Sequence, residues 1–469
     1  MKKKYNWLLT YCKTVKLLFK ISPPYLFFTV VLSLIVGIST PITIYIWKDV
    51  INSIESILKV GDVSIQDIDI LFKIIISYLV VKQANCLAMA LMQYVQNIYN
   101  DYINKDIAEL IFQKILSYRL EIFDDASIYN EIEKANSETA IRSLSILQIL
   151  VNSIQYIAAF IGTAIILLPY SQSVVIGCIV TSIPAFYVGY RIMNKLYEVY
   201  NRRFERNRFI NAIKKILTNS DFMKEIKIFS SGHYLLEKIE KTFKKNIVED
   251  KKIQKKITLE NAAVLCFDDI STILLKGIVI AIGIKNKVMI GTIMMNISAV
   301  DSVKNSLKNL LSVLSTACED CLYMQSFFNI YEQKDRVTEK PDFNEEIYSI
   351  EFIDVSFKYP KTEKNIIDRL NMKFVKGKNY AIVGENGSGK STVIKLLCGL
   401  YFATEGKILI NGQDIKKFNV VSIYSKIGCV FQEFVKYPLS IKENIAISNI
   451  QEKENQALIK EVTDRKSVV

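Results

Sequence analysis

The segment Gly384-Glu-Asn-Gly-Ser-Gly389-Lys390-Ser391 decides the fold of the C-terminal part of this 469-residue chain. It matches the pattern G-x-x-x-x-G-K-S/T, and it lies between a β-like run, Tyr380–Val383, and a helix-prone stretch that starts at Thr392. Glycines let backbone N–H groups turn inward around phosphate oxygens, and the start of the helix adds a favourable dipole. The pattern therefore predicts a phosphate-binding loop (P-loop) between a strand and a helix.

Two side chains of this loop carry its chemistry. Lys390 supplies a positive charge to the outer phosphates of a nucleotide, and Ser391 offers its hydroxyl to Mg²⁺. A glycine-rich turn without a ligand is disfavoured, because strand, loop, lysine, hydroxyl and helix all agree. The residues predicted to hold the nucleotide here are Gly384, Glu385, Asn386, Gly387, Ser388, Gly389, Lys390, Ser391 and Thr392.

The composition points away from a soluble enzyme. Hydrophobic residues make up 50% of the chain and charged residues 23%, which excludes a disordered protein and argues against an ordinary soluble one. The formal charge is +13, a balance typical of proteins that bind nucleic acid or a membrane. The single histidine, His233, removes His-based zinc sites and a Ser-His-Asp triad.

The closest pair of cysteines, Cys318 and Cys321, has zinc-like spacing. Neither a second pair nor a histidine lies near it in the sequence. Two small residues on successive turns of a helix are therefore the favoured interpretation, and a reduced cytosolic face suits the cysteines.

Six apolar runs are long enough to cross a membrane as helices, for which roughly 20 mainly apolar residues are needed. They lie near Tyr25–Trp47, Ile70–Tyr94, Ile146–Leu168, Val174–Met193, Ala262–Ile284 and Thr292–Leu314. Before them, the stretch Tyr5–Lys20 has Lys13, Lys16 and Lys20 on one helical face, and it predicts an amphipathic helix on the membrane surface.

The charges of the loops predict the orientation of these spans. The loop between the fourth and fifth runs is dense in Lys and Arg, while the loop at Pro169–Ser173 carries no charge and the loop after the first run is mostly acidic. Positive loops stay in the cytoplasm. We expect a multi-pass protein of the cytoplasmic membrane with both termini inside. Much of the positive charge is then explained by the orientation of the spans in the membrane. We therefore expect no nucleic acid partner.

Ionisable residues occur inside two of the runs. Intramembrane charges are costly, and they usually face a cavity or a partner. Lys82 lies in the second run, and Lys276 in the fifth; for both, a cavity is the preferred interpretation. For Asp268 and Asp269, a cavity and a helical extension below the bilayer remain equally open.

The chain changes character near Tyr331. Residues 332–347 are polar and predict a linker, and short β-like runs follow at Ile350–Phe357, Asn371–Val375 and Tyr380–Val383. The predicted organisation is a transmembrane domain at 1–331, the linker at 332–347, and the N-terminal part of a nucleotide-binding domain at 348–469. The fold class is thus an all-α, six-helix membrane domain followed by an incomplete α/β P-loop domain.

With these motifs the sequence resembles the exporter-type ATP-binding cassette (ABC) transporters, in which a membrane domain precedes a nucleotide-binding domain. The resemblance covers nearly the whole chain. It rests on the P-loop and on flanking motifs, namely Val355-Ser-Phe-Lys-Tyr-Pro, Val375-Lys-Gly-Lys, Gly399-Leu-Tyr, Glu405-Gly-Lys-Ile-Leu-Ile-Asn-Gly, Val430-Phe-Gln and Ile441-Lys-Glu-Asn-Ile. Phe402-Ala-Thr-Glu departs from it, because the family often has a proline there.

The resemblance implies roles for further residues. Tyr359 corresponds to the aromatic side chain that stacks on adenine, and Gln432 to the switch-loop glutamine that reaches Mg²⁺ and the attacking water. Lys390 and Gln432 would then be the catalytic residues, and Ser391 and Gln432 the metal ligands. The internal stretches Arg119–Glu131 and Lys224–Tyr234 resemble coupling helices, which would dock near Gln432.

One absence limits the resemblance. After Gln432 the sequence contains no LSGGQ-like signature, no apolar strand ending in Asp-Glu, and no switch histidine. We therefore expect a truncated or partial product that binds nucleotide without hydrolysing it.

The complete protein is expected to be an ATPase that exports an unidentified substrate, as half of a homo- or heterodimeric transporter that uses ATP and Mg²⁺. A non-catalytic ATP-binding membrane subunit that regulates or scaffolds a partner transporter is the alternative. The sequence does not identify the substrate.

Overall fold

The protein divides into two compact units. The computed structural model describes residues 7–60, 64–332, 340–360, 362–432 and 434–464. The helical unit comprises Met1–Phe112 and Glu131–Glu332, and the sheet unit comprises Gln113–Asn130 and Gln333–Val469. The short segment Gln113–Asn130 thus belongs to the sheet unit, although it connects two long helices of the N-terminal part.

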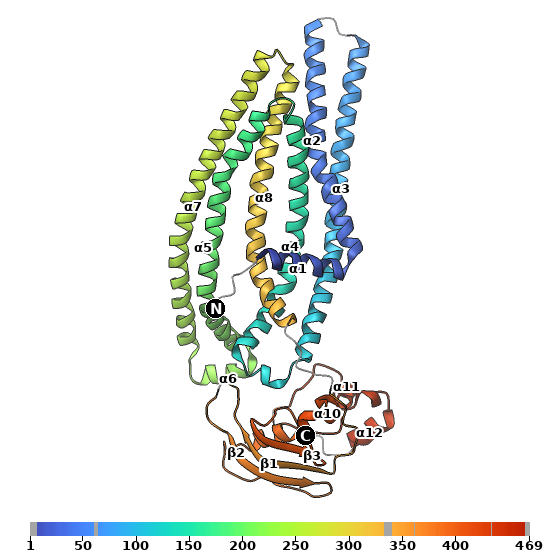
Figure 1. Cartoon of the computed structure of the whole chain (residues 1–469), viewed down its shortest axis with the longest axis vertical. Helices are drawn as coiled ribbons and strands as arrows, with labels where there is room; N and C mark the ends of the chain where they lie inside the picture. Colours follow the sequence, from blue (N-terminus) through green and yellow to red (C-terminus); the bar gives the residue numbers. More distant parts are fainter. Residues whose placement is uncertain (1–6, 61–63, 333–339, 361, 433, 465–469) are drawn as a thin grey trace. The chain divides into compact units, whose positions relative to one another are not determined.

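Long helices make up the helical unit (Figure 1). The elements are α1 (Trp7–Ile21), α2 (Pro23–Val60), α3 (Ile65–Leu116), α4 (Ala126–Leu167), α5 (Gln172–Thr218), α6 (Ser220–Ile228), α7 (Gly232–Lys285) and α8 (Ile290–Tyr331). The six apolar runs fall, in order, on α2, α3, α4, α5, α7 and α8.

Four stretches among the described helices are long and apolar enough to cross a membrane. They are Pro23–Lys59, Ile65–Leu116, Glu138–Leu167 and Gln172–Ile192. The predicted runs on α7 and α8 are not among them, and each carries three charged side chains. These are Asp268, Asp269 and Lys276 on α7, and Asp301, Lys304 and Lys308 on α8. Length and hydropathy therefore support four of the six predicted spans.

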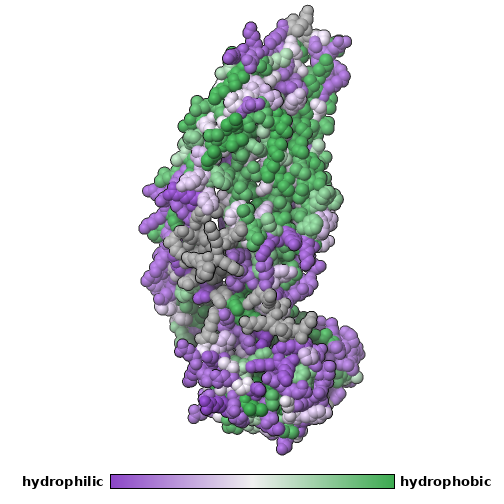
Figure 2. Space-filling model, in the orientation of Figure 1, coloured by the Kyte–Doolittle hydropathy of each residue, from purple (hydrophilic) through white to green (hydrophobic). Residues whose placement is uncertain are grey.

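Small residues allow the long helices to approach closely. A Cβ atom on Gly37 of α2 would lie 2.6 Å from the backbone oxygen of Gln155 on α4. A Cβ on Gly177 of α5 would lie 2.7 Å from the side chain of Leu275 on α7. Small residues serve this purpose in membrane helix packing, where van der Waals contact replaces the hydrophobic effect. The face in Figure 2 carries a broad hydrophobic band over this unit, with hydrophilic side chains at both ends.

The amphipathic N-terminal helix is present as α1. It begins at Trp7, so Tyr5 of the predicted stretch lies outside the described residues. Leu17 and Leu18 are buried, and the hydroxyl of Tyr99 on α3 donates a hydrogen bond of 2.6 Å to the backbone oxygen of Leu18. The helix is therefore fixed to the helical unit through its apolar side.

An antiparallel sheet forms the centre of the sheet unit. Its strands are β1 (Ser349–Phe357), β2 (Ile367–Val375), β3 (Glu405–Ile410) and β4 (Gln413–Asp414), in the order β2-β1-β3-β4. Ile350 of β1 pairs with Phe374 of β2 on one side and with Ile410 of β3 on the other. Strands β1 and β2 correspond to two of the predicted β-like runs.

Helix α9 (Lys390–Leu397) follows the predicted loop and packs on the core of this unit. Its buried residues Val393 and Leu396 join a cluster that includes Phe352, Val355 and Tyr401. The remaining elements are short: η1 (Leu120–Ile122), η2 (Ile415–Lys417), α10 (Val420–Tyr424), α11 (Ile441–Ala446), η3 (Ile450–Glu452) and α12 (Gln456–Asp464). The packing of α9 fixes the position at which the loop ends.

The prediction of a strand at Tyr380–Val383 is wrong for this structure. The segment has no regular secondary structure, and Val383 is 90% exposed. A buried strand of a parallel sheet needs a neighbouring strand on each side. The four strands of the described residues pair only with one another, so the segment has no ladder to join.

Residues 340–347 of the predicted linker contain neither helix nor strand, and the preceding residues 333–339 lie outside the described part of the chain.

Candidate functional site

The predicted P-loop is a tight turn that ends at the first residue of α9. Gly387 and Gly389 have φ angles of +83° and +90°, a region that other residues rarely adopt. A Cβ atom on Gly389 would also lie 3.2 Å from the backbone oxygen of Ile366. The turn thus requires glycine at these positions, and it leaves Gly384 to Ser388 exposed at the start of a helix. Such a site suits an anion.

Lys390 holds the two ends of the loop together. Its Nζ donates hydrogen bonds of 2.8 Å to the backbone oxygen of Gly384 and 2.6 Å to that of Glu385. The ammonium group therefore already lies at the loop, with backbone carbonyls as its partners. Ser391 is exposed on the first turn of α9. The structure brings Lys390 to the loop, as the motif predicts.

Tyr359 lies beside the same helix. Its hydroxyl is 3.2 Å from Oγ1 of Thr392, a residue of the predicted nucleotide site. The ring is half-buried, and it makes edge contacts with Phe357 and Tyr401 at centroid distances of 5.0 and 5.4 Å. Nζ of Lys395 lies 5.6 Å from its centroid. Tyr359 and the P-loop helix are thus neighbours, although the sequence separates them by about thirty residues.

The structure does not bring Gln432 into this group. Its side chain is exposed, and within the described residues no hydrogen bond from it to the loop is recorded. Three residues before it, Cys429 interacts with Cys398 at the end of α9. Burial, together with this neighbour, raises the pKa of Cys398 to about 11. The segment before Gln432 is therefore tied to α9, whereas the role of the glutamine stays a prediction.

The first predicted coupling stretch contacts Tyr401 and Phe402 of its own unit. Around η1, Asp124 accepts a hydrogen bond of 2.7 Å from the hydroxyl of Tyr401, and Glu121 accepts one of 3.3 Å from the backbone N–H of Phe402. The guanidinium of Arg119 lies 3.7 Å from the ring centroid of Phe402. The predicted docking of this stretch near Gln432 stays a prediction.

The second coupling stretch coincides with α6 and the start of α7. It lies in the helical unit, where Phe229 is 74% exposed. Sequence reasoning missed Tyr401, whose partner Asp124 is 277 residues away in the chain.

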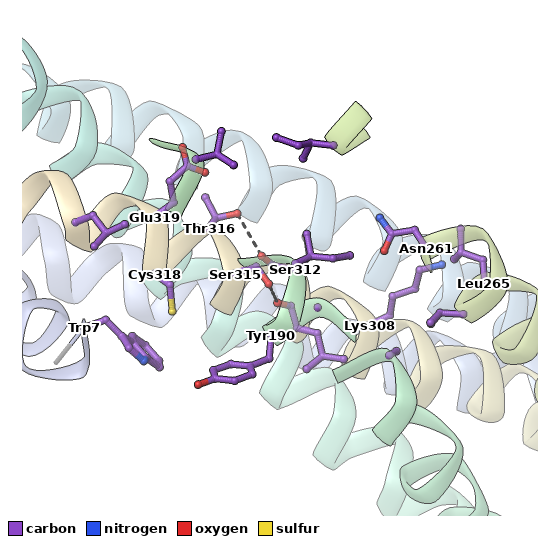
Figure 3. A pocket seen from close by; sticks show the side chains of 18 of the residues that line it. Trp7, Tyr190, Asn261, Leu265, Lys308, Ser312, Ser315, Thr316, Cys318 and Glu319 are labelled. Atoms are coloured by element: carbon purple, nitrogen blue, oxygen red, sulfur yellow. Dashed lines mark hydrogen bonds between the residues drawn. The ribbon is translucent and has the colours of Figure 1, made fainter. Parts of the chain in front are cut away.

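A cavity of about 1050 Å³ lies in the helical unit between α5, α7 and α8 (Figure 3). Its wall combines aromatic rings, among them Trp7 and Tyr190, with a run of hydroxyl groups on α8, including Ser312, Ser315 and Thr316. Lys308 lines one end and Glu319 the other. The cavity thus offers both apolar and charged surface.

The charged residues of the apolar runs pair between helices. Lys304 of α8 lies 2.6 Å from Asp268 of α7, and both line the cavity. Lys276 of α7 lies 2.6 Å from Asp301 of α8. The sequence singled out four ionisable residues inside the apolar runs as candidates for a cavity. Only Asp268 lines this cavity, whereas Lys82, Asp269 and Lys276 do not. Lys304 was missed, although it is a charge within an apolar run, the same signal that singled out Lys276.

Known proteins resemble this chain over most of its length. Residues 367–468 match the family described as ABC transporter. The subtilin transport ATP-binding protein SpaT of Bacillus subtilis is 28% identical over 458 residues, which cover 96% of this chain and 73% of the relative. The nisin transport ATP-binding protein NisT of Lactococcus lactis subsp. lactis is 25% identical and covers 97% and 75%, respectively.

The fold agrees with this assignment. The solved structure of a bacterial Atm1-family ABC exporter with ATP bound matches with a TM-score of 0.72, covering 89% of this chain and 73% of the other at 20% identity. Residues 367–468 are therefore part of an ABC transporter nucleotide-binding region, and the chain, with its helical membrane region in front of it, is similar to ABC exporters over most of its length. Members of this family are transport ATPases.

Proposed function

We propose that this chain is one half of a dimeric exporter that uses ATP to move a substrate across the cytoplasmic membrane. The observation that carries the proposal is the position of Lys390, held at a glycine loop that opens a helix. The hydrophobic band of the helical unit supports the membrane location (Figure 2). The named relatives are transport proteins, which favours export over the alternative of a regulatory or scaffolding subunit.

The residues of the P-loop fit a nucleotide. A Cβ on Gly384 would lie 2.8 Å from Oγ of Ser388, so any larger residue at position 384 would crowd the inside of the turn. The exposed backbone from Gly384 to Ser388, with Glu385, Asn386 and Gly387 between them, would hold phosphate oxygens, together with Gly389 and Thr392. Lys390 would exchange its two carbonyl partners for phosphate oxygens, and Tyr359 would stack on the adenine ring.

Ser391 and Gln432 are the proposed ligands of Mg²⁺, which supplies charge neutralisation to the phosphates. The hydroxyl of Ser391 is exposed beside Lys390 and is free to orient. Gln432 is the proposed residue for positioning water. Phosphoryl transfer depends mainly on positioning and charge stabilisation, so these residues would act without covalent chemistry.

We further propose that the domain limits are 1–331, 332–347 and 348–469, and that both termini lie in the cytoplasm. The excess of Lys and Arg between the fourth and fifth apolar runs, on the second half of α5 and the first half of α7, supports this orientation. The partner is a second half-transporter, identical or different, and the cavity between α5, α7 and α8 is the part of this half that would meet the substrate.

Substitution of Lys390 tests the nucleotide site. Lys390→Ala removes the main cation of the loop, so it should abolish binding of a fluorescent ATP analogue, measured by titration of the purified chain. Lys407→Ala is the matched control, because Lys407 is an exposed lysine of β3 outside the loop. Equal affinity of the Lys390 variant and the parent chain would disprove the proposed site.

A further inference from the structure

We propose that Tyr401 is a positioning residue that transmits the binding of an adenine base at Tyr359 to the segment Arg119–Asp125. The signal would depend on the base and not on the number of phosphates attached to it. This inference rests on the proposed nucleotide site. It assigns to the site a second output, distinct from any response to the terminal phosphate.

The contact on the nucleotide side is aromatic. The ring of Tyr401 meets that of Tyr359 edge-on, with 5.4 Å between centroids and an interplanar angle of 83°. Nζ of Lys395 on α9 lies 5.6 Å from the ring centroid of Tyr359 and 5.7 Å from that of Tyr401. Edge-to-face pairs have a preferred geometry. A base that stacks on Tyr359 and shifts its ring would therefore shift Tyr401 as well.

The contact on the other side is a directed hydrogen bond. Tyr401 is 2% exposed, and its single hydroxyl donates to Asp124 at 2.7 Å. Burial and the nearby carboxylate raise the pKa of Tyr401, so the phenol keeps its proton and remains a donor. The neighbouring residue, Phe402, adds the contacts with Glu121 and Arg119. A movement of Tyr401 would therefore act on the segment through two adjacent residues, Tyr401 and Phe402.

The base, rather than the phosphates, is the expected signal because of where the chain of contacts begins. It runs from Tyr359 through Tyr401 to Asp124. The recorded partners of Lys390, in contrast, are the loop carbonyls of Gly384 and Glu385. Phosphates held by the loop would act on these atoms first. The base side of the site thus has the direct route to Arg119–Asp125.

Hydrogen exchange of the segment gives the test, with the full 469-residue chain in detergent. The backbone N–H groups of Ile122, Phe123 and Asp125 donate hydrogen bonds within the segment, so their exchange reports its opening. The probes are ATP, ADP and inorganic tripolyphosphate, each at saturating concentration. ATP and ADP should both slow exchange in the parent chain, and tripolyphosphate should leave it unchanged.

Variants separate the relay from general packing. Tyr401→Phe keeps the ring and removes the hydroxyl, so the slowing by ATP should be lost while the affinity for ATP is retained. Asp124→Leu should act in the same way, and Asp124→Asn should retain the slowing because its amide oxygen still accepts a hydrogen bond. Tyr348→Phe is the control: it is an exposed tyrosine of the same unit, and its hydroxyl interacts with the carboxylate of Glu346, outside the segment.

The outcomes are distinct. Slowing that persists in Tyr401→Phe would overturn the proposal, as would slowing by tripolyphosphate equal to that by ATP. Loss of the effect in Tyr348→Phe as well would show a general effect of losing a hydroxyl, and it would also overturn the relay. A parent chain that fails to bind ATP would instead disprove the nucleotide site itself, whereas ATP binding without any slowing would disprove only the relay.

Discussion

Nζ of Lys304 lies 2.6 Å from Oδ1 of Asp268, and the lysine side chain is only 3% exposed. The ammonium group also donates hydrogen bonds of 2.9 Å to the hydroxyl of Thr181 and 3.0 Å to that of Ser271. These three acceptors match the three donors of an ammonium group. Because Thr181 lies on α5, Asp268 and Ser271 on α7, and Lys304 on α8, one side chain links three helices around the cavity.

We expect Lys304→Met to destabilise the helical unit, because it leaves the carboxylate of Asp268 without its cation. Removal of one partner of a buried pair typically costs about 3–5 kcal/mol. The measurement is the temperature at which half of the purified protein loses its monodisperse elution peak. Lys244→Met is the control: its pair with Glu240 lies on α7 outside the apolar run, with side chains 71% and 62% exposed, and exposed pairs contribute little to stability.

The double variant Lys304→Met with Asp268→Leu removes both charges, so it should recover much of the lost thermal stability. Equal shifts for Lys304→Met and Lys244→Met would contradict the role assigned to Lys304.

Substitutions of Tyr359 should separate stacking from anchoring. Tyr359→Ala removes the ring and is expected to weaken ATP binding by about 1–3 kcal/mol, the usual cost of losing one base–aromatic stack. Tyr359→Phe removes only the hydroxyl that lies 3.2 Å from Thr392, so its effect should be smaller. Titration with a fluorescent ATP analogue measures both. A larger loss for the Phe variant would show that anchoring, and not stacking, matters at this position.

The local features of the site were predictable from the sequence. The P-loop is specified by contiguous residues, and the positive φ angles of Gly387 and Gly389 explain why the motif contains glycine there. Strands β1 and β2 follow from short runs rich in β-branched and aromatic residues. Helices α2 to α5 follow from long apolar runs, since hydropathy and length are properties of the segment itself.

Features that depend on distant partners were not predictable. Tyr401 and Asp124 are 277 residues apart in the sequence, and no sequence motif around either residue predicts their hydrogen bond. The run Tyr380–Val383 has the composition of a buried strand, yet a strand also needs neighbours, and the sheet of the described residues does not supply them. The charges on α7 and α8 lower the hydropathy of both helices, and only the structure shows that they pair with each other.

We expect the chain to bind ATP without steady turnover. Residues 433–469 contain no LSGGQ-like signature and no apolar strand that ends in Asp-Glu, the motifs that complete the catalytic site in the family that the sequence resembles. Release of phosphate by the purified chain should remain at the background level in detergent and in lipid bilayers. The control is the nucleotide titration of the same sample, which should show binding. Turnover at a rate typical of phosphoryl-transfer enzymes, about 1–100 per second, would refute this prediction.

Labelling of single cysteines should establish the orientation. In a background with the eight native cysteines replaced by serine, Phe229→Cys places a thiol at the turn after α6, where the side chain is 74% exposed. The segment between the fourth and fifth apolar runs, which includes this turn, is rich in Lys and Arg, and such segments stay in the cytoplasm. A membrane-impermeant maleimide should therefore label this thiol in inverted vesicles and not in intact cells.

Gln172→Cys is the matched variant, because it lies exposed at the start of α5, beside the uncharged turn that follows α4. One passage of α5 through the bilayer separates it from Phe229. The same maleimide should label Gln172→Cys in intact cells, and pretreatment of those cells should block its later labelling in vesicles. Labelling of Phe229→Cys from outside would reverse the orientation. Labelling of both thiols from the same side would show that α5 does not cross the membrane between them, since a single span must place its two ends on opposite faces.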